Sequence, residues 1–516
     1  MVVLDCSWEE IKTLVGEISK DELKSICFKY GLDVNIQDDL VSFEVTSERS
    51  DLYTIHSISF LINQIRGRSQ VVSPDFDKID FDVRIESNKR NKIVLLVLEL
   101  ERNNPNIVKE IAQLTDKTSD SLGRRRKIAG VGAFDFDKIK PPLIYKKVDD
   151  ISFVPLGFNK EFSLKEILEN TFQGRTYDIK EYFAWFSDKD VIALVPIINA
   201  DKFSVNENTK RILFEISGED EYVVNNIATS ILFNAKLLGK VYAIKGFEPK
   251  IIERSLEFDY NLISDLLGKE IQRDIAIENL AKLGFECKFN GNKMIVKVPF
   301  YRQDVISYAD IADEILRLQG TEYVGYETPK TFNKGEFIKS EPLIEAIREI
   351  LISLGFQEVD SSVLSSKLYQ EDIIQEKGIR AGEFYLKQYI YPELIKFYKN
   401  NKDKEGPYYF FDIGYTIKKD PSVDVKYKNV LSLSLFIADE KRNVSWLVAI
   451  LKEIASRVMN KEIKIENSSH PSFIEGRFAK LFINDKYIGL AGEIHPKILN
   501  ELSLDLPVSV LEIMLE

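Results

Sequence analysis

Cysteine is scarce in this sequence, and the few thiols form no pattern. The 516 residues include only Cys6, Cys27 and Cys287. An odd number of widely spaced cysteines predicts neither a disulfide framework nor a zinc site built on thiolates. We therefore expect the protein to work in a reducing compartment, which we take to be the cytoplasm.

Long apolar runs are also missing. The longest, at residues 93–98 and 191–198, fall far short of the roughly 20 residues that a membrane helix needs. Residues 1–10 carry early acidic side chains and lack the apolar stretch of a secretory signal. These absences argue against a membrane role and against export.

Histidine is rare, and its positions do not indicate a catalytic triad. His56, His470 and His495 are scattered along the chain. None stands in a serine or cysteine pattern typical of nucleophilic catalysis. We expect these side chains to pack or to cap helices rather than to catalyse.

Positive charge is in deficit, because the formal net charge is −12. A protein that binds nucleic acid over its whole surface needs a high density of Lys and Arg against the phosphates. Any RNA site must therefore be local, and the run Arg124, Arg125, Arg126 and Lys127 is one candidate. A short basic run is more often a solvated turn, so the pattern leaves both interpretations open.

The chain is long and rich in residues that can form hydrophobic cores. A chain of 516 residues exceeds what one hydrophobic core organises, and this length predicts three or four domains. Hydrophobic residues make up 44% and charged residues 29%, as in ordinary globular proteins. Helical and strand patterns mix along the chain, so we predict a multidomain α+β protein.

Breaks in these patterns predict four domains. Pro74 lies in a linker-like stretch, and Pro329 and Gly335 interrupt the pattern later. We predict an N-terminal α+β domain over residues 1–85, a mixed α/β domain over residues 86–255, a small acidic module over residues 256–330, and a last domain of helices over an antiparallel sheet at residues 331–516.

Several elements can be predicted individually. Ser7 is a plausible N-cap for a helix that begins at Trp8. Apolar periodicity and turn residues predict helices over residues 107–122 and 444–459, a strand over residues 191–198, and a hairpin over residues 479–490 that turns at Asn484 and Asp485.

The clearest candidate site is the segment 301–314, Tyr-Arg-Gln-Asp-Val-Ile-Ser-Tyr-Ala-Asp-Ile-Ala-Asp-Glu, which follows a predicted strand. Asp310, Asp313 and Glu314 are spaced to share one helix face, and Asp304 at the strand end can join them. Clustered carboxylates repel unless a cation bridges them, and an all-oxygen site favours Mg²⁺. Acids in a first helical turn also complement the helix dipole, so the spacing alone does not decide.

This segment resembles the module of archaeal-type phenylalanine–tRNA ligase β subunits in which Tyr-Arg-x-Asp leads into an acidic helix. The resemblance extends over nearly the whole chain, and it implies that Asp304, Asp310, Asp313 and Glu314 are magnesium ligands. Further segments similar to the family, in the family's order, are residues 44–52, 132–142, 153–158, 196–199, 470–471, 475–477 and 489–496.

In that family the mixed domain hydrolyses tyrosine that has been wrongly attached to the tRNA. The resemblance implies that Asn199, Lys210 and Ser217 line the editing pocket. Lys210 stands where archaeal relatives tend to carry arginine, and Ser217 where they tend to carry threonine. Because lysine and arginine differ in their contacts with RNA and carboxylates, the sequence leaves both retained and lost editing open.

The resemblance also implies a partner. It gives the last domain a class II synthetase architecture, but the strings Phe-Arg-x-Glu and Gly-x-Gly-x-x-Arg, with which that class holds ATP, are absent from the sequence. No residue of this chain is therefore expected to catalyse aminoacylation. A separate α subunit is expected to bind ATP and attach phenylalanine to tRNA(Phe), in a complex of two α and two β subunits. The alternatives are a stand-alone hydrolase of mischarged Tyr-tRNA and a purely structural or tRNA-binding subunit.

Overall fold

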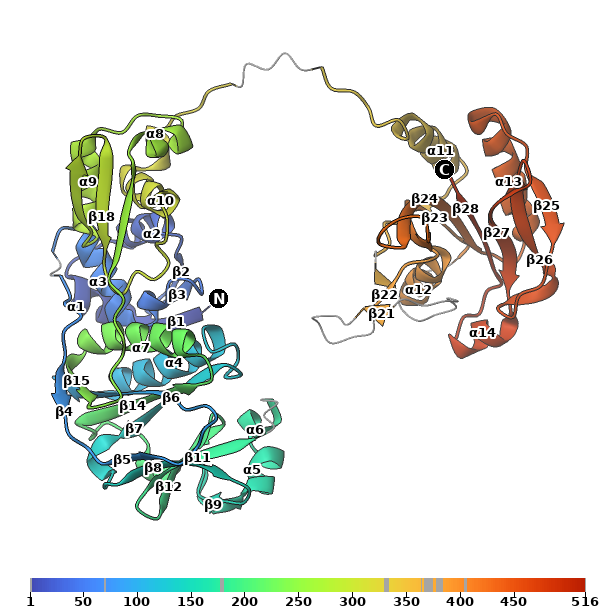
Figure 1. Cartoon of the computed structure of the whole chain (residues 1–516). Helices are drawn as coiled ribbons and strands as arrows, with labels where there is room; N and C mark the ends of the chain where they lie inside the picture. The colour runs from blue at the N-terminus through green and yellow to red at the C-terminus, as the bar shows by residue number, and fades with distance from the viewer. Residues whose placement is uncertain are drawn as a thin grey trace. The chain divides into compact units, whose positions relative to one another are not determined.

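The chain folds into two compact units, Met1–Thr328 and Pro329–Glu516, which Figure 1 shows in colours that follow the residue number. The computed structural model describes residues 2–68, 71–176, 181–328, 334–362, 364–365, 375–376, 384–402 and 406–515. Several sheets combine with helices in both units, which makes the protein a multidomain α+β chain. None of the helices in these described residues has the length and apolarity to cross a membrane.

The first unit begins with a three-stranded antiparallel sheet, in the order β1-β3-β2. The side chain of Ser7 accepts a hydrogen bond from the backbone N–H of Glu10 at 3.1 Å, which confirms the predicted cap of the first helix. The elements are β1 (Val2–Ser7), α1 (Trp8–Val15), α2 (Lys20–Lys29), β2 (Asp33–Gln37), β3 (Leu40–Val45) and α3 (Ile55–Ile65).

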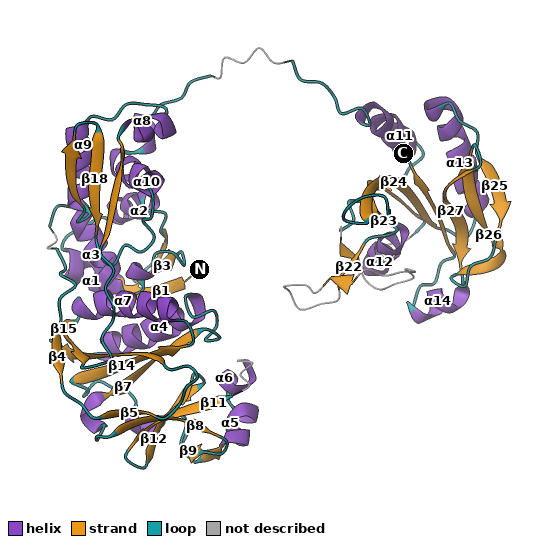
Figure 2. Cartoon of the chain, viewed as in Figure 1, coloured by secondary structure: helices purple, strands orange, loops and turns teal. Residues whose placement is uncertain are grey.

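Two five-stranded sheets, β4-β15-β6-β14-β7 and β13-β12-β11-β8-β5, follow in the same unit. Figures 1 and 2 show the long helices α4 and α7 over one face of the first sheet, with the second sheet against its other face. The main elements are β4 (Asp77–Ile79), β5 (Val83–Ile85), β6 (Lys92–Leu100), α4 (Pro105–Ser121), β7 (Ala129–Asp135), β8 (Leu143–Val148), β11 (Tyr182–Ser187), β12 (Asp190–Val195), β13 (Ile198–Asn199), β14 (Arg211–Gly218), α7 (Glu221–Lys236) and β15 (Gly239–Ile244). Shorter elements are β9 (Ser152–Phe153), β10 (Phe162–Ser163), α5 (Leu164–Asn170) and α6 (Phe172–Thr176).

The apolar run in β6 follows from this layering. Leu96 and Leu98 pack in the core beneath the helices, whereas Leu95 and Val97 pack in the core between the sheets. A strand that is buried on both faces has no polar side to expose. The sequence of β6 is therefore continuously apolar, without the alternation of apolar and polar residues that a half-exposed strand shows.

The strand predicted over residues 191–198 is divided in two. Strand β12 ends at Val195, the Val195–Pro196 peptide is cis, and β13 begins at Ile198. Proline has no backbone N–H to donate to a sheet ladder. The chain therefore turns at Pro196 and pairs back on itself, with Ala193 opposite Asn199.

The first unit ends with a small antiparallel sheet in the order β16-β18-β17. Its helices contribute Ile263, Leu280 and Ile311 to the same core that underlies α4 and α7. The elements are β16 (Arg254–Asp259), α8 (Asn261–Leu267), α9 (Arg273–Lys282), β17 (Glu286–Asn290), β18 (Lys293–Val298) and α10 (Tyr308–Gln319).

The second unit is built on a seven-stranded sheet in the order β19-β23-β24-β28-β27-β26-β25. All neighbours pair antiparallel except β19 and β23. Helices α11 and α13 pack on one face, and α12 and α14 belong to a separate core on the other. The elements are α11 (Glu341–Ser353), β19 (Gln357–Glu358), α12 (Tyr391–Asn401), β23 (Tyr408–Lys419), β24 (Tyr427–Ala438), α13 (Val444–Ile454), β25 (Lys464–Asn467), β26 (Phe473–Ile483), β27 (Lys486–Ile494), α14 (Pro496–Glu501) and β28 (Val508–Met514), with the short strands β20 (Leu364–Ser365), β21 (Gln375–Glu376) and β22 (Phe384–Leu386) in a second sheet.

The hairpin predicted near the carboxyl end is confirmed. Strands β26 and β27 pair antiparallel and are joined at Asn484 and Asp485, whose φ angles are 48° and 60°. Positive φ at both central residues suits the right-handed twist of a hairpin, and Asn and Asp tolerate it. The helix predicted over residues 444–459 is also present, but its last turn, Ala455–Met459, widens into a π-helix.

Candidate functional site

Strand β14 carries polar side chains into the apolar space between the two five-stranded sheets. Successive residues of a strand point to opposite faces. Phe214 and Ile216 belong to the core under the helices, whereas Leu213 belongs to the core between the sheets. Glu215 and Ser217 therefore face the second sheet, and both are buried. Burying a carboxylate in an apolar layer costs free energy, so its presence there calls for a function.

Two glycines accompany these residues on the neighbouring strand β7. Glu215 is paired with Gly132, and Ser217 with Gly130. A Cβ atom at Gly132 would lie 2.6 Å from the ring of Phe134 and 3.4 Å from Oε2 of Glu215. Only glycine permits this close approach, so β7 leaves the polar groups of β14 without a covering side chain.

Further polar groups converge on Glu215. Tyr145 of β8 and Trp185 of β11 face it from the second sheet, with ring centroids 4.8 Å apart. Arg90 is buried nearby and attracts its charge. We call Arg90, Tyr145, Trp185, Glu215 and Ser217 the polar cluster.

Each member of the polar cluster has an atom without a well-formed hydrogen bond among the described residues. These atoms are Arg90 Nε, Tyr145 Oη, Trp185 Nε1, Glu215 Oε1 and Ser217 Oγ. An unsatisfied buried polar atom costs about 1–3 kcal/mol, and native proteins contain few of them. Ser217 and Trp185 lie close enough to Glu215 to lower its pKa as hydrogen-bond donors, so these atoms satisfy one another in part, and the cluster keeps hydrogen-bonding capacity for a bound molecule.

The protonation of the polar cluster is set mainly by burial. Burial raises the pKa of Glu215, and Ser217, Trp185 and Arg90 offset only part of that rise. The carboxyl group is therefore a better proton acceptor than an exposed glutamate. It can form a strong hydrogen bond with a hydroxyl group that enters this dry space.

The three predicted editing residues are only partly brought together. Ser217 belongs to the polar cluster, and Asn199 lies near it, with its Nδ2 atom 3.4 Å from the carbonyl oxygen of Ala133 on β7. Lys210 is exposed just before β14. Seven residues of extended chain separate it from Ser217, which is about 23 Å along a strand. Lys210 therefore lies at the far end of β14 from the polar cluster.

The acidic segment is organised around a buried arginine. Arg302 donates from Nε to Oδ1 of Asp304 at 2.9 Å, from Nη2 to Oδ2 at 2.7 Å, and from Nη2 to Glu314. Burial lowers the pKa of Arg302, but Glu314 and Asp304 outweigh burial and hold it well above its usual range. Burial raises the pKa of Asp304, and Arg302 reverses that shift. Arg49 and Asp51 form a second buried pair of the same geometry.

The other two predicted magnesium ligands have separate partners. Oδ2 of Asp310 accepts hydrogen bonds from the N–H and hydroxyl of Ser307 and caps helix α10. Asp313 is exposed and pairs with Arg317 one turn later. Across the described residues, no group of three or more His, Cys, Asp or Glu side chains is placed to hold a metal ion.

These contacts do not fit a magnesium site made of all four carboxylates. Arg302 already neutralises Asp304 and Glu314, and a divalent ion beside it would face a buried positive charge. Asp310 instead serves a structural role, because its Oδ2 atom accepts from the backbone N–H groups of Ile306 and Ser307, just before helix α10. The magnesium ligand set stays a prediction.

The chain is similar to known proteins over nearly its whole length. Three family models match it: the B3/4 domain at residues 78–268, the tRNA synthetase B5 domain at residues 256–321, and the phenylalanyl tRNA synthetase beta chain CLM domain at residues 328–515. The phenylalanine–tRNA ligase beta subunit of Archaeoglobus fulgidus is 28% identical, over 99% of this chain and 98% of that protein. The chain belongs to the phenylalanine–tRNA ligase β-subunit family.

Other similar proteins are also β subunits of phenylalanine–tRNA ligases. The beta subunit of Methanocaldococcus jannaschii is 29% identical over 92% of both chains. A crystal structure of an N-terminal fragment of the phenylalanyl-tRNA synthetase beta subunit from Pyrococcus horikoshii is 25% identical and has a TM-score of 0.56. The structural match covers 99% of that fragment and 61% of this chain.

Sequence reasoning missed most of the polar cluster of this β subunit. Glu215 interrupts the apolar run of residues 212–216, and this interruption was the available signal. Tyr145 and Trp185 look like ordinary core aromatics of a strand. Arg90 gives no local signal, because its relation to Glu215 depends on how two distant strands pair.

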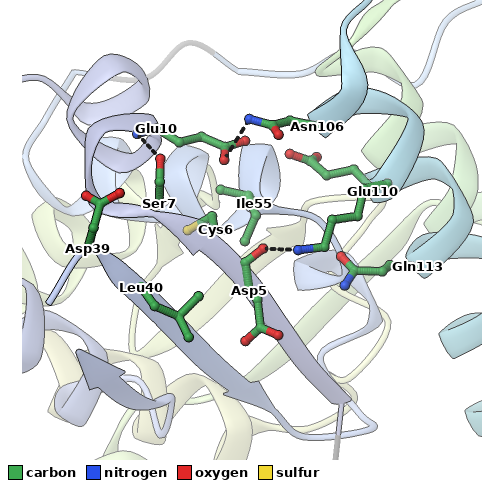
Figure 3. A pocket seen from close by; sticks show the side chains of 11 residues that line it. Asp5, Cys6, Ser7, Glu10, Asp39, Leu40, Ile55, Asn106, Glu110 and Gln113 are labelled. Carbon is green, nitrogen blue, oxygen red and sulfur yellow. Dashed lines mark hydrogen bonds between the residues drawn. The ribbon is translucent and has the colours of Figure 1, made fainter. Parts of the chain in front are cut away.

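A separate hollow of about 410 Å³ lies in the first unit, between the N-terminal sheet and α4. Figure 3 shows the side chains that line it. Asn106 donates to Glu10, and Lys109 donates to the carbonyl oxygen of Asp5 at 3.0 Å. Nδ1 of His56, which the sequence predicted to pack or cap, lies 3.0 Å from Glu110. Glu10, Lys109 and Glu110 are thus each engaged by a protein partner. The lining residues are Asp5, Cys6, Ser7, Glu10, Asp39, Leu40, Ile55, Asn106, Lys109, Glu110 and Gln113.

The second unit has an aromatic hollow of about 430 Å³ beside a buried carboxyl group. Glu512 of β28 accepts hydrogen bonds from the backbone N–H groups of Ile390 and Tyr391, at 2.8 and 2.9 Å, where α12 begins. Burial nevertheless raises the pKa of Glu512 to about 7, against the opposing charge of Lys418. The hollow is lined by Tyr389, Tyr391, Ser469, His470, Pro471, Phe473, Phe478, Lys480, Tyr487 and Leu490.

This carboxyl group should make the second unit less stable as pH rises. Because the pKa of Glu512 is raised from 4.5 to about 7, the folded chain binds the proton more tightly than the unfolded chain does. The resulting stabilisation is complete below pH 4.5, is lost as pH rises through 7, and amounts to roughly 3 kcal/mol. Urea unfolding of Glu512→Gln across this range should show a flatter profile than the wild type, with the exposed Glu501→Gln as control. Parallel profiles would contradict the prediction.

Proposed function

We propose that this chain supports the ATP-dependent attachment of phenylalanine to tRNA(Phe), as the β subunit of a phenylalanine–tRNA ligase whose α subunit performs the chemistry. The supporting observation is the match over 99% of this chain and 98% of the Archaeoglobus fulgidus β subunit. The chain is thus part of an enzyme without carrying the aminoacylation site.

In this proposal the complex uses ATP and Mg²⁺, and ATP binds to the α subunit. The sequence has neither of the arginine-containing strings with which class II synthetases hold ATP. The acids of the segment 301–314 are engaged by protein donors, chiefly Arg302. The proposed complex contains two α and two β subunits and works in the cytoplasm.

The second unit supplies the docking surface for the α subunit. Its broad, mostly antiparallel sheet with helices on both faces supports a class II synthetase-like architecture. Obligate interfaces of this kind commonly bury more than about 2,000 Å². The unit would thus act as a scaffold for the catalytic subunit.

Hydrolytic editing is a second proposed function, carried by the polar cluster. Glu215 would accept a hydrogen bond from the phenolic hydroxyl of a tyrosyl group, and Ser217 and Asn199 would help to hold the ester and its attacking water. Phenylalanine lacks that hydroxyl and would leave Glu215 unpaired in a dry pocket. A site that recognises a hydroxyl in this way rejects its absence strongly. Lys210 would act away from this pocket, on the RNA.

The requirement for the α subunit is the direct test. The purified chain alone should neither exchange pyrophosphate into ATP nor charge tRNA(Phe), because it lacks an ATP site. Co-expression with the α subunit should restore both activities and give one complex on gel filtration. Either activity in the isolated chain would refute the proposal.

The same preparations separate the alternatives. A stand-alone hydrolase would release tyrosine from mischarged Tyr-tRNA without the α subunit, whereas a purely structural subunit would release none in either preparation. Lys210→Ala and Asn199→Ala are informative variants here. The distance from Lys210 to Ser217 leads us to expect the larger loss from Asn199→Ala.

A further inference from the structure

A basic turn follows helix α4 at the edge of the first five-stranded sheet. Arg124, Arg125 and Arg126 have φ angles of 50°, 53° and 61°. Left-handed backbone is unfavourable for an L side chain and is usually adopted by single residues, most often glycine. Three successive arginines in this conformation persist only if the surroundings hold them, and such strained segments cluster at functional sites.

Two buried or half-buried arginines hold the turn. Arg90 donates to the carbonyl oxygens of Lys127 at 3.0 Å and Arg126 at 3.3 Å. Arg126 donates to the carbonyl oxygen of Pro196 at 3.2 Å and pairs with Asp116. Arg90 and Arg126 are therefore used to fix the shape of the turn.

Arg124 and Arg125, the other two arginines of the turn, are free to bind a partner. Arg124 and Arg125 are exposed, and within the described chain neither side chain has an ion pair or hydrogen bond. A turn that only reversed the chain would be better served by glycine or asparagine. Holding two arginines in a strained backbone instead places two exposed guanidinium groups at successive positions of the turn.

The turn lies next to the polar cluster. Gly130, only a few residues after the turn, pairs with Ser217. Pro196, which accepts from Arg126, lies 3.2 Å from where a Cβ of Gly130 would stand. Arg90 joins the two features directly, because it binds the turn and attracts Glu215.

We propose that Arg124 and Arg125 bind phosphates of the acceptor end of an aminoacyl-tRNA, and so bring its ester to the polar cluster. This inference rests on the proposed editing function. Guanidinium groups suit phosphate because they donate two parallel hydrogen bonds. A local pair of arginines also explains how a chain with a net charge of −12 can hold RNA at this point.

The double variant Arg124→Gly/Arg125→Gly tests this role in the complex with the α subunit. Glycine adopts left-handed backbone freely, so the melting temperature should not fall. In single-turnover hydrolysis of Tyr-tRNA, the half-saturating enzyme concentration should rise about tenfold while the saturating rate stays unchanged. The salt slope of tRNA binding, read by filter binding, should fall by about 1.4 to 1.8, or 0.7 to 0.9 for each lost phosphate contact.

The matched control is Lys24→Ala/Lys29→Ala, which removes the same charge from exposed positions on α2. It should leave both readouts near the wild type. Equal changes in the two double variants, or no change in the glycine variant, would overturn the inference. If the wild-type complex releases no tyrosine, the editing proposal fails, and the salt slope alone then decides whether the turn binds RNA.

Discussion

Arg302→Met is expected to lower the free energy of local unfolding around helix α10 by about 3 to 5 kcal/mol. Arg302 is 3% exposed, and it is bound to Asp304 and Glu314, which are also largely buried. Its removal leaves two carboxylates in a low-dielectric interior without a cation. Hydrogen exchange read by mass spectrometry on the intact chain measures the opening of α10 directly.

Two further variants separate charge from packing. Arg317→Met removes the half-buried partner of the exposed Asp313 and should cost less than about 1 kcal/mol, because solvent screens that pair. The triple variant Arg302→Met/Asp304→Asn/Glu314→Gln removes the buried charges together and should recover much of the loss. If the triple variant loses as much stability as Arg302→Met does, the effect comes from lost packing and not from uncompensated charge.

The same exchange experiment bears on the predicted magnesium ligands. With Arg302 present, adding or chelating Mg²⁺ should leave the protection of α10 unchanged, because the guanidinium already balances Asp304 and Glu314. Protection of α10 that depends on Mg²⁺ in the wild type would instead support the set of four carboxylates. Hydrogen exchange of the α10 peptide therefore distinguishes neutralisation by Arg302 from a magnesium site made of the four carboxylates.

The acidic segment shows what sequence spacing can establish. Asp310, Asp313 and Glu314 do lie on one helix, α10, as their spacing assumed. It does not reveal the partner of each acid. Arg302 is two residues from Asp304 but reaches Glu314 only because the strand end folds back over the helix. Local pattern thus predicts the element, and the packing of neighbouring elements determines the charge balance.

The editing candidates illustrate the same limit. Resemblance singled out Ser217, which belongs to the polar cluster, and Lys210, which lies at the far end of β14. Tyr145 and Trp185 join Glu215 only when the second sheet closes over the first. Their pairing depends on contacts between strands far apart in sequence. A single sequence therefore suggests one member of the cluster and leaves the others hidden.

Glu215→Ala should lower kcat/KM for hydrolysis of Tyr-tRNA by the complex by roughly 100-fold or more. The variant removes the acceptor that distinguishes tyrosine from phenylalanine, so the slow hydrolysis of correctly charged Phe-tRNA should change far less. Glu215→Gln keeps a carbonyl acceptor and should retain more activity than alanine. Initial rates on the two charged tRNAs give both comparisons.

Two variants test whether the effect belongs to the polar cluster. Glu207→Ala removes an exposed carboxylate from the same domain and should leave hydrolysis unchanged. Gly132→Ala keeps every polar group but places a methyl group within 3.4 Å of Oε2 of Glu215 and against the ring of Phe134. It should impair hydrolysis by displacing the carboxylate. If Glu215→Ala hydrolyses Tyr-tRNA as fast as the wild type does, the polar cluster is not the editing site.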